Sequence, residues 1–318
     1  MSDLNPEFNV FHQQISLGTS QEKMMRNLRQ SLRRRIMQYF HEKLNLRPPI
    51  FSSRGRQATA TAVSPAYEEM VLEEGALLQH IQPDGIGTWP KPEIVHLLML
   101  NAIQNHTPDP PIDRKSSICV RYAGIYRIEI SILAPGSDGN QLAINGARSW
   151  QPDMQGRLAV WFKNQIKHQG LQLQRVARYL HAWADFHPNR MDRFAWQLPL
   201  DILAACYFQA DIERDDKSLA RTAAALAEAA PSDFRWPISS GEENVFPWPL
   251  PRQESRIFFQ SLEVLAERSR LAVKTKDKMH ACAIWRSLLG SRFPMAGAST
   301  RKFNSAGRRW RAPGQTRY

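Results

Sequence analysis

Cysteine is scarce in this chain, and long hydrophobic runs are absent. The three cysteines among 318 residues, Cys119, Cys206 and Cys282, lie far apart and form no CxxC pair. This spacing excludes a disulfide framework or a paired-cysteine zinc site, and it favours buried free thiols in a reducing cytosol. No stretch approaches the roughly 18 to 20 apolar residues of a membrane span, and MSDLNPEFNV lacks signal-peptide features. We therefore expect a cytoplasmic protein with no membrane partner.

Several catalytic signatures are also missing. The nine histidines form neither an HExxH motif nor an HxH cluster, which favours packed or exposed side chains over metal ligands. The chain has no GxxxxGK[ST] loop and no GxSxG elbow, so ordinary ATPase and serine-hydrolase chemistry lack support. Candidate chemistry has to be sought in other residue types.

Acidic residues are outnumbered, 30 to 42, which gives a formal net charge of +12. The excess is concentrated in residues 26–35, with five arginines, and in residues 298–318, with six cations and no acid. Such charge favours an anionic partner: nucleotide, nucleic acid or an acidic protein face. Trp310, inside the second cluster, suits nucleic acid or an acidic groove. Solvated arginines on a helix and a solvated terminus explain the two clusters equally well.

The first half of the chain mixes helix and strand patterns. Apolar spacing predicts a long helix over residues 20–44, and Pro92 suits the first turn of a helix over 92–106. Residues 70–78 are strand-like, and we expect a turn at Glu73-Glu74-Gly75 to break them. Residues 134–150 are rich in Gly, Asn and Ser, which predicts a loop.

Residues 117–133 alternate apolar and polar side chains, which predicts two strands joined near Gly124. Ile128, Ile130 and Ile132 should point to one face. The residues between them, Arg127, Glu129 and Ser131, should point to the other.

The second half is mostly helical in its periodicity. Its predicted helices cover residues 155–186 (one or two helices), 197–210, 216–230, 252–271 and 275–290. We therefore predict an α/β core over residues 1–150 that includes the long N-terminal helix. A helical lobe over 151–293 and a basic disordered tail over 294–318 follow.

A glycine turn followed by an acidic strand occupies residues 53–75, as SRGRQATAT and then EMVLEEG. Polymerase-β-type nucleotidyltransferases use this order for a physical reason. Their Gly-Ser turn presents N–H groups to a triphosphate, and the strand carries two acids at i and i+2 on one face. A third acid comes from a neighbouring strand, and the three carboxylates hold two magnesium ions.

The collinear motifs resemble the bacterial relatives of cyclic GMP-AMP synthase, the cGAS/DncV-like nucleotidyltransferases of anti-phage signalling, from about Phe11 to Phe293. The family patterns QGS(F/Y)xxxT, E(M/Y)D(I/L)DDG and V(H/Y)IDIPIYA correspond here to SRGRQATAT, EMVLEEG and YRIEISILA. RVARYLHAWAD, NVFPWPLP and WRSLLGSRFP are similar to its helical half. The resemblance implies a polymerase-β-type core, a mainly helical C-terminal lobe, and synthesis of cyclic oligonucleotides that an effector reads.

The chain departs from the family pattern at the turn serine, at the three metal-acid positions, and at His181, where the family often has a lysine. Val71 stands at the first metal-acid position, Glu73 at the second and Glu129 at the third, while Arg56 replaces the turn serine. Valine cannot coordinate a metal, and each glutamate is one methylene longer than aspartate. Magnesium requires near-ideal geometry, and misplacement of about 1 Å can lower a rate roughly 100-fold. Glu69 shares the strand face but lies two residues too early to restore the site.

The resemblance therefore leaves three functions open. The first is a catalytically degenerate protein that binds nucleotide, nucleic acid or a protein partner, such as an active relative or an effector. The second is an active synthase in which Glu73 and Glu129 hold Mg²⁺ or Mn²⁺; without activity, no cofactor is expected. The third is a basic nucleic-acid-binding protein that keeps only the scaffold. By the resemblance, the nucleotide-binding positions are Gly55, Arg56, Glu74, Arg175 and His181.

Overall fold

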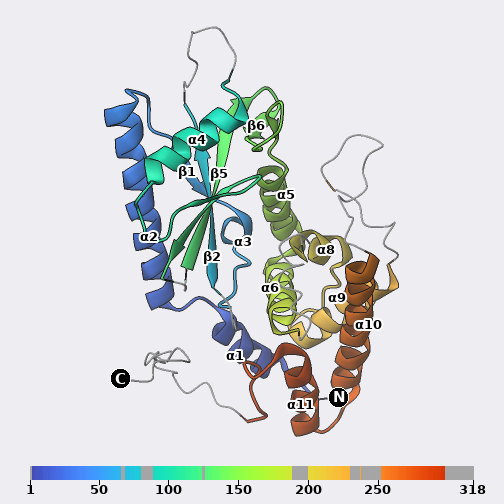
Figure 1. Ribbon diagram of the computed structural model, residues 1–318. Coiled ribbons are helices and arrows are strands. Elements are labelled where there is room, and N and C mark those ends of the chain that lie inside the picture. Colours follow the sequence, from blue (N-terminus) through green and yellow to red (C-terminus); the bar gives the residue numbers. More distant parts are fainter. Residues whose placement is uncertain are drawn as a thin grey trace, which may run out of the picture.

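Figure 1 shows the computed structural model, in which a lobe built on a β-sheet lies beside a helical lobe. The structure describes residues 2–65, 69–79, 89–123, 126–187, 200–229, 237 and 252–297, with backbone alone at 252–255. Gly124, the NVFPWPLP motif, Trp310 and the tail from residue 298 onward lie outside these ranges. Within them, no helix combines the length and the apolar character needed to cross a membrane.

One mixed sheet of seven strands runs through the described part of the first lobe. The order is β1 (Ile50–Ser53), β2 (Met70–Leu77), β5 (Tyr126–Gly136), β4 (Ile118–Tyr122) and β3 (Ile112–Asp113), while β6 (Gly139–Leu142) joins β5 to β7 (Gln151–Pro152). The β2–β5 pair is parallel, and the other pairs are antiparallel. The candidate acids on β2 and β5 therefore lie on adjacent inner strands, beside the glycine turn that follows the end strand β1.

Two local expectations for these strands are wrong. The predicted break at Glu73-Glu74-Gly75 does not occur, because all three residues pair with β5 and the last two also pair with β1. Pairing on both sides keeps the backbone extended in spite of the glycine. Residues 134–150 are not all loop, because β5 continues to Gly136 and pairs with β6 as a hairpin.

Two helices cover one face of the sheet, α2 (Thr19–Gln38) and α4 (Pro92–Ile103). Ile128, Ile130 and Ile132 are buried in this core, as their alternation predicts. The predicted helix over 20–44 is confirmed, although its last turn, Tyr39–Lys43, widens to a π-helix. The opposite face therefore carries the side chains of the alternate residues.

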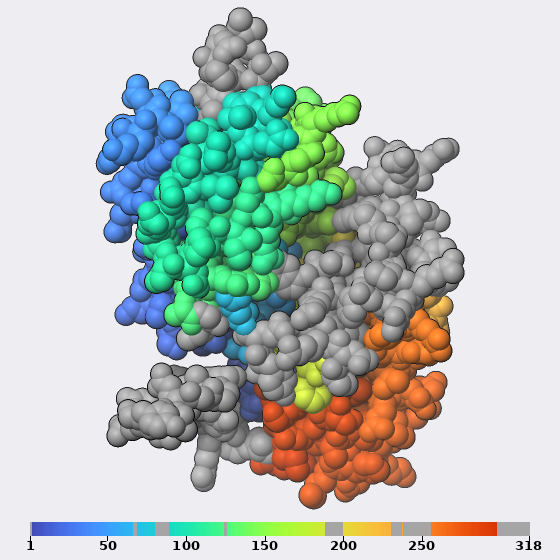
Figure 2. Space-filling view, in the orientation of Figure 1, coloured from blue at the N-terminus to red at the C-terminus, as the bar shows by residue number. Residues whose placement is uncertain are grey.

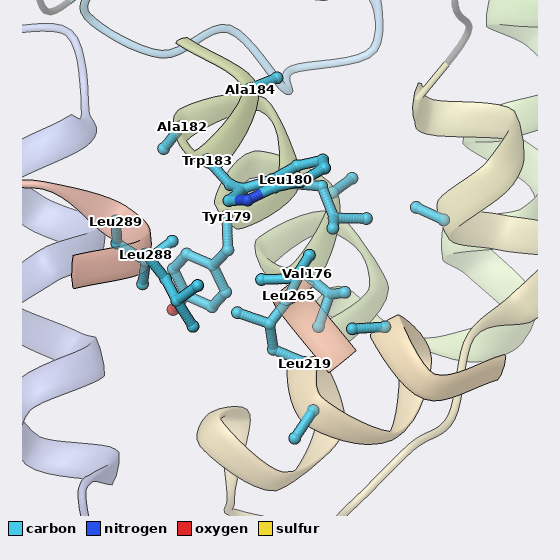
Figure 3. Close-up of a cluster of buried hydrophobic side chains, with 14 of the residues drawn as sticks. Val176, Tyr179, Leu180, Ala182, Trp183, Ala184, Leu219, Leu265, Leu288 and Leu289 are labelled. Atoms are coloured by element: carbon cyan, nitrogen blue, oxygen red, sulfur yellow. The ribbon is translucent and has the colours of Figure 1, made fainter. Parts of the chain in front are cut away.

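The second lobe packs six helices of the described chain around one apolar cluster. They are α5 (Met154–Gln169), α6 (Leu171–Phe186), α8 (Leu200–Tyr207), α9 (Asp215–Glu228), α10 (Arg252–Lys274) and α11 (Lys278–Leu289). Figure 3 shows Val176, Tyr179 and Trp183 of α6 beside leucines from the neighbouring helices. The helices predicted for this half are confirmed within the described residues.

An unpredicted helix, α1 (Asn5–Ile15), precedes the long helix α2. Its Phe8 and Phe11 are fully buried in the second lobe's cluster, where Phe8 makes edge contacts with Tyr179 and Trp285. The first residues of the chain thus pack with its last helices, although the helix that follows them covers the sheet. The N-terminal segment ties the two lobes together.

The expectation of buried cysteines holds for two of the three residues. Cys119 and Cys282 are buried free thiols, as predicted, but the described structure leaves Cys206 exposed on α8. The apolar neighbours Leu203 and Ala204 occupy the buried positions of that short helix. A helix of eight residues has too few inward positions for every apolar side chain.

Candidate functional site

The glycine turn begins where β1 ends. Gly55 has a φ of +53° and starts the short helix α3 (Gly55–Ala58). Arg54, before it, is buried and donates to Asp153 through Nη1 (2.7 Å) and Nη2 (2.5 Å). Asp153 also caps α5 by accepting from the Gly156 amide. This two-bond ion pair anchors the turn to the second lobe, and the sequence patterns gave no signal for it.

The carboxylate of Glu73 lies directly over the glycine turn. A Cβ built on Gly55 would come within 1.5 Å of Glu73 Oε2, so a larger residue would have to push the carboxylate aside, and the positive φ also favours glycine. Gln155 Nε2 donates to Glu73 Oε1 at 2.7 Å and holds the carboxylate there. The space beside the turn, where a phosphate would approach the backbone, is therefore filled by a negative group of the chain itself.

Glu129 faces the same side of the sheet as Glu73, because the two are register partners in the parallel β2–β5 pair. It is only 4% exposed. Ser117 Oγ donates to its Oε2 at 2.8 Å. Its Oε1 forms ion pairs with Arg127 Nε at 3.3 Å and Arg114 Nη1 at 3.2 Å. Oε2 thus accepts a hydrogen bond from the chain itself, whereas Oε1 has two guanidiniums at ion-pair distance but no hydrogen-bond partner among the described residues.

Arg127 is the register partner of Val71, the first metal-acid position. Its Nη1 lies 3.2 Å from Glu69 Oε2, while its Nε faces Glu129. Glu69, Arg127, Glu129 and Arg114 therefore form a row of alternating charge. A guanidinium sits between the two acids on the face where the family pattern implies metal ions.

The residues present do not fit a two-metal site. Val71 offers no donor atom, Glu73 is directed to Gly55 and Gln155, and Glu129 is held by two guanidiniums. A divalent ion at Glu129 would have to displace a cation already paired there. Across the described ranges, no group of three or more His, Cys, Asp or Glu side chains is arranged to hold a metal.

Glu74 points away from Glu73, into the face covered by α2. It is 2% exposed, and its Oε2 lies 2.9 Å from Arg29 Nε, while Arg33 donates to its Oε1. Burial raises the pKa of Glu74, although the two arginines oppose that shift. Arg33 also lies over the Phe51 ring, 5.5 Å from its centroid. Two arginines of the 26–35 cluster are therefore paired with a buried acid of the chain itself. Glu74 lies on the face of the sheet opposite the glycine turn and does not contribute to it.

The two predicted residues on α6 have different surroundings. Arg175 donates to Asp215 through Nε (2.7 Å) and Nη2 (2.9 Å), which commits it to a pair inside the helical lobe. His181 is buried, and its Nε2 lies 2.8 Å from Asp201 Oδ1. Thr61 donates to the other oxygen of Asp201 at 3.0 Å. His181 thus connects, through Asp201, to the loop that follows the glycine turn.

The Asp201 bridge holds its charge in spite of burial. Burial disfavours the carboxylate, but the charge of His181 and hydrogen bonds from it and the neighbouring threonines outweigh burial and lower the pKa of Asp201. Thr59 and Thr61 share a further hydroxyl contact at 2.7 Å. The network positions the loop against α6 and α8, and sequence patterns alone did not reveal it.

Arg56 follows Gly55 and is partly exposed. Within the described residues its guanidinium makes no ion pair, unlike Arg54 and Arg127. It is the cation of the turn that remains available to an outside anion. Of the predicted positions, the structure brings together Gly55, Arg56, Val71, Glu73 and Glu129. It places Glu74 and Arg175 in other surroundings.

No family model matches the chain. Solved structures do match, over most of their length. The Vibrio cholerae DncV cyclic AMP-GMP synthase with nonhydrolyzable GTP has a TM-score of 0.71 and 18% identity, covering 88% of this chain and 93% of that one.

Two further structures agree. V. cholerae DncV with GTP and 5MTHFGLU2 has a TM-score of 0.76 and 15% identity, covering 92% and 97%. Escherichia coli DncV with 3'-deoxy GTP has a TM-score of 0.70 and 15% identity, covering 88% and 93%. The chain has the fold of these nucleotidyltransferases, which confirms the predicted fold class.

Proposed function

We propose that this chain, on a DncV-type fold, acts by binding a partner and not by metal-dependent nucleotidyl transfer. The observation that supports it most directly is Arg127. This residue lies opposite Val71 and pairs with both Glu129 and Glu69. The anti-phage setting implied by the resemblance is part of the same proposal. In that setting the partner is an active relative, an effector or a nucleic acid.

The charge balance of the site supports this proposal. In a metal-dependent enzyme, the carboxylates must be free to coordinate ions that neutralise the triphosphate. Here the row from Glu69 to Arg114 contains two anions and two cations and is neutral without a metal. The unneutralised acid, Glu73, repels phosphate from the turn because it lies over Gly55.

Nucleotide incubation tests the proposal. Purified protein would be incubated with radiolabelled ATP, GTP, CTP and UTP, first with Mg²⁺ and then with Mn²⁺. Phosphatase-resistant products would be separated by chromatography, and Glu73→Ala/Glu129→Ala would serve as the control. We expect no product from the folded wild-type protein. A product that disappears in the control would overturn the proposal.

Metal binding gives a second readout that does not depend on activity. Electron paramagnetic resonance of Mn²⁺ titrated with the protein should show free ion only. The double variant Val71→Asp/Arg127→Ser adds an acid and removes the competing guanidinium, so it should bind Mn²⁺. If the wild-type protein binds Mn²⁺ and loses it on Glu129→Ala, the arginine does not exclude the metal and the proposal fails.

One observation favours the alternative of an active synthase. Glu73 and Glu129 are register partners on one face, which is the arrangement two metal-bridging acids require. That enzyme would have to release Glu129 from Arg127 and Arg114 when metal and nucleotide enter. Thermal stabilisation by ATP only when metal is present would support it, whereas stabilisation without metal would indicate binding through Arg56.

A further inference from the structure

A groove of about 320 Å³ lies between α9 and α10 in the helical lobe. Its floor is made of small apolar side chains, Ala220 and Ala224 from α9 and Val273 from α10. Alanines keep this space open, because larger side chains would fill it. Figure 2 shows α10 in orange at the molecular surface.

Four cations line the groove, two from each helix: Lys217 and Arg221 on α9, and Arg270 and Lys274 on α10. Each pair is four residues apart, so the two charges of a pair lie one helical turn, about 6 Å, apart along the axis. No acid lines the groove. The result is an apolar strip with a positive row on either side.

The charges of this region are segregated. The two acids at the start of α9, Asp215 and Asp216, are fully buried and paired with Arg175 and Arg214. Of the groove cations, Arg221 has an acid partner, Asp211, at 2.8 Å. In the described part of the chain the other three have no ion pair. The positive charge of the groove is therefore available to an outside anion.

We propose that this groove docks an acidic amphipathic helix of a partner protein. Carboxylates four residues apart on such a helix have the same spacing as the cations on α9 and α10. An apolar stripe between them would lie on the Ala220–Ala224–Val273 floor, the helix-in-groove mode of recognition. A single-stranded nucleic acid is the poorer fit, because its bases need aromatic platforms and no aromatic side chain lines the groove.

This surface uses residues separate from the glycine turn, so the inference goes beyond the proposed function. The partner is identified by chemistry alone: negative charge in two rows and a narrow apolar stripe. A second copy of this chain is the alternative occupant of the groove, and self-association has to be tested by experiment. Sedimentation would report self-association, and a dimer that depends on the groove cations would overturn the proposal.

Fluorescence anisotropy tests the docking directly. The probe is a labelled helical peptide of about 20 residues, long enough to hold helical structure, with glutamates four apart beside a leucine stripe. A scrambled peptide of equal composition is the first control, and a single-stranded RNA of equal charge is the second. The designed peptide should bind more tightly than either control. Equal binding by the scrambled peptide, or RNA binding with no peptide binding, would overturn the proposal.

Matched variants localise the binding. Arg270→Gln/Lys274→Gln removes two groove cations and should weaken the peptide Kd roughly tenfold. Lys163→Gln/Lys167→Gln removes two exposed cations with the same spacing from α5 and should change it by no more than about twofold.

Ala224→Phe fills the floor without changing charge and should also weaken binding. Thermal melts confirm that each variant is folded. Equal weakening by the groove and α5 pairs would show general charge attraction and refute the docking site. Peptide affinity unchanged by Ala224→Phe would likewise exclude the floor. Neither result bears on nucleotide transfer, since no nucleotide or metal enters the assay.

Discussion

Two glutamates on the paired strands β2 and β5, Glu74 and Glu129, meet arginines in opposite ways on the two faces of the sheet. Glu74 points under α2, where Arg29 and Arg33 come from a helix packed over it. Glu129, beside Glu73 on the other face, meets Arg127 from its own strand and Arg114 from the loop before β4. The first pair lies within the core of the lobe. The second lies where the family pattern implies metal ions.

The difference shows that the same residue chemistry can have two roles. On the helix-covered face water does not reach the Glu74 carboxylate, so removing one partner leaves an uncompensated buried charge. On the other face, the guanidinium of Arg127 occupies the surroundings in which family members would need an exchangeable cation. We interpret the first pair as fold-determining and the second as function-determining. Four predictions test that division.

Removing Glu74 should have the largest effect on stability. Glu74→Ala leaves Arg29 and Arg33 without their acid in a buried position, which should lower the free energy of unfolding by about 3 to 5 kcal/mol. Urea unfolding followed by circular dichroism measures the change. Glu73→Ala, the neighbouring acid on the other face, is the control and should lower stability far less. Similar losses in the two variants would contradict the division between the faces.

Removing Arg127 should have a moderate effect. Arg127→Met keeps the packing of the side-chain stem but leaves Glu129 with one guanidinium fewer, which should lower stability by roughly 1 to 3 kcal/mol. The same variant should be rescued in part by Glu129→Gln, because the buried charge is then removed as well. Urea denaturation of the single and double variants gives the coupling energy. Additive effects would show that the pair is not energetically linked.

The strand pattern around residues 70–75 and 126–133 predicted which side chains share a face. Because alternation fixes the face within a strand, the shared face of Val71 and Glu73 followed from the sequence, and the family resemblance supplied Glu129 on a neighbouring strand. Their partners did not. Arg127 faces Val71 only because β2 and β5 pair in one particular register, and no pattern within either strand specifies that register.

The same limit explains the other contacts that were missed. Arg54 pairs with Asp153, which lies 99 residues away, and His181 pairs with Asp201 across two helices. Long-range partners depend on tertiary packing. Helix α1, in contrast, left a readable signal: Phe8, Phe11 and Ile15 recur at three- and four-residue spacing and are buried. The pattern covers only about three helical turns, which is a weak periodic signal.

A substitution at Gly55 tests whether the Glu73 carboxylate lies over the glycine turn. Gly55→Ala places a Cβ on a residue with positive φ, which costs about 1 to 2 kcal/mol, and forces that Cβ against the Glu73 carboxylate. The double variant Gly55→Ala/Glu73→Ala should recover the part due to the clash but not the part due to φ. Thermal melts of the three proteins separate the two parts. If the double variant is no more stable than Gly55→Ala, the carboxylate does not lie over the turn in solution.

The smallest expected effect is the pH dependence contributed by Glu74. Burial raises its pKa above the ordinary value of 4.5, so the folded state holds this proton at a pH where the unfolded state has lost it. The Glu74 contribution to stability is therefore fully present below pH 4.5 and decreases as pH rises through the folded-state pKa. Its slope cannot exceed about 1.4 kcal/mol per pH unit.

His12 titrates in an overlapping pH range, because burial and Arg178 lower its pKa to about 4. Its effect on stability has the opposite pH dependence to that of Glu74. Its contribution is therefore lost as pH falls from 6.5 towards 4. It is common to the wild-type protein and to Glu74→Gln, so it cancels when their urea stabilities are subtracted at each pH. The difference, wild type minus variant, should decrease from pH 4.5 upward. A difference that increases over that range would mean that the arginines, and not burial, dominate the environment of Glu74.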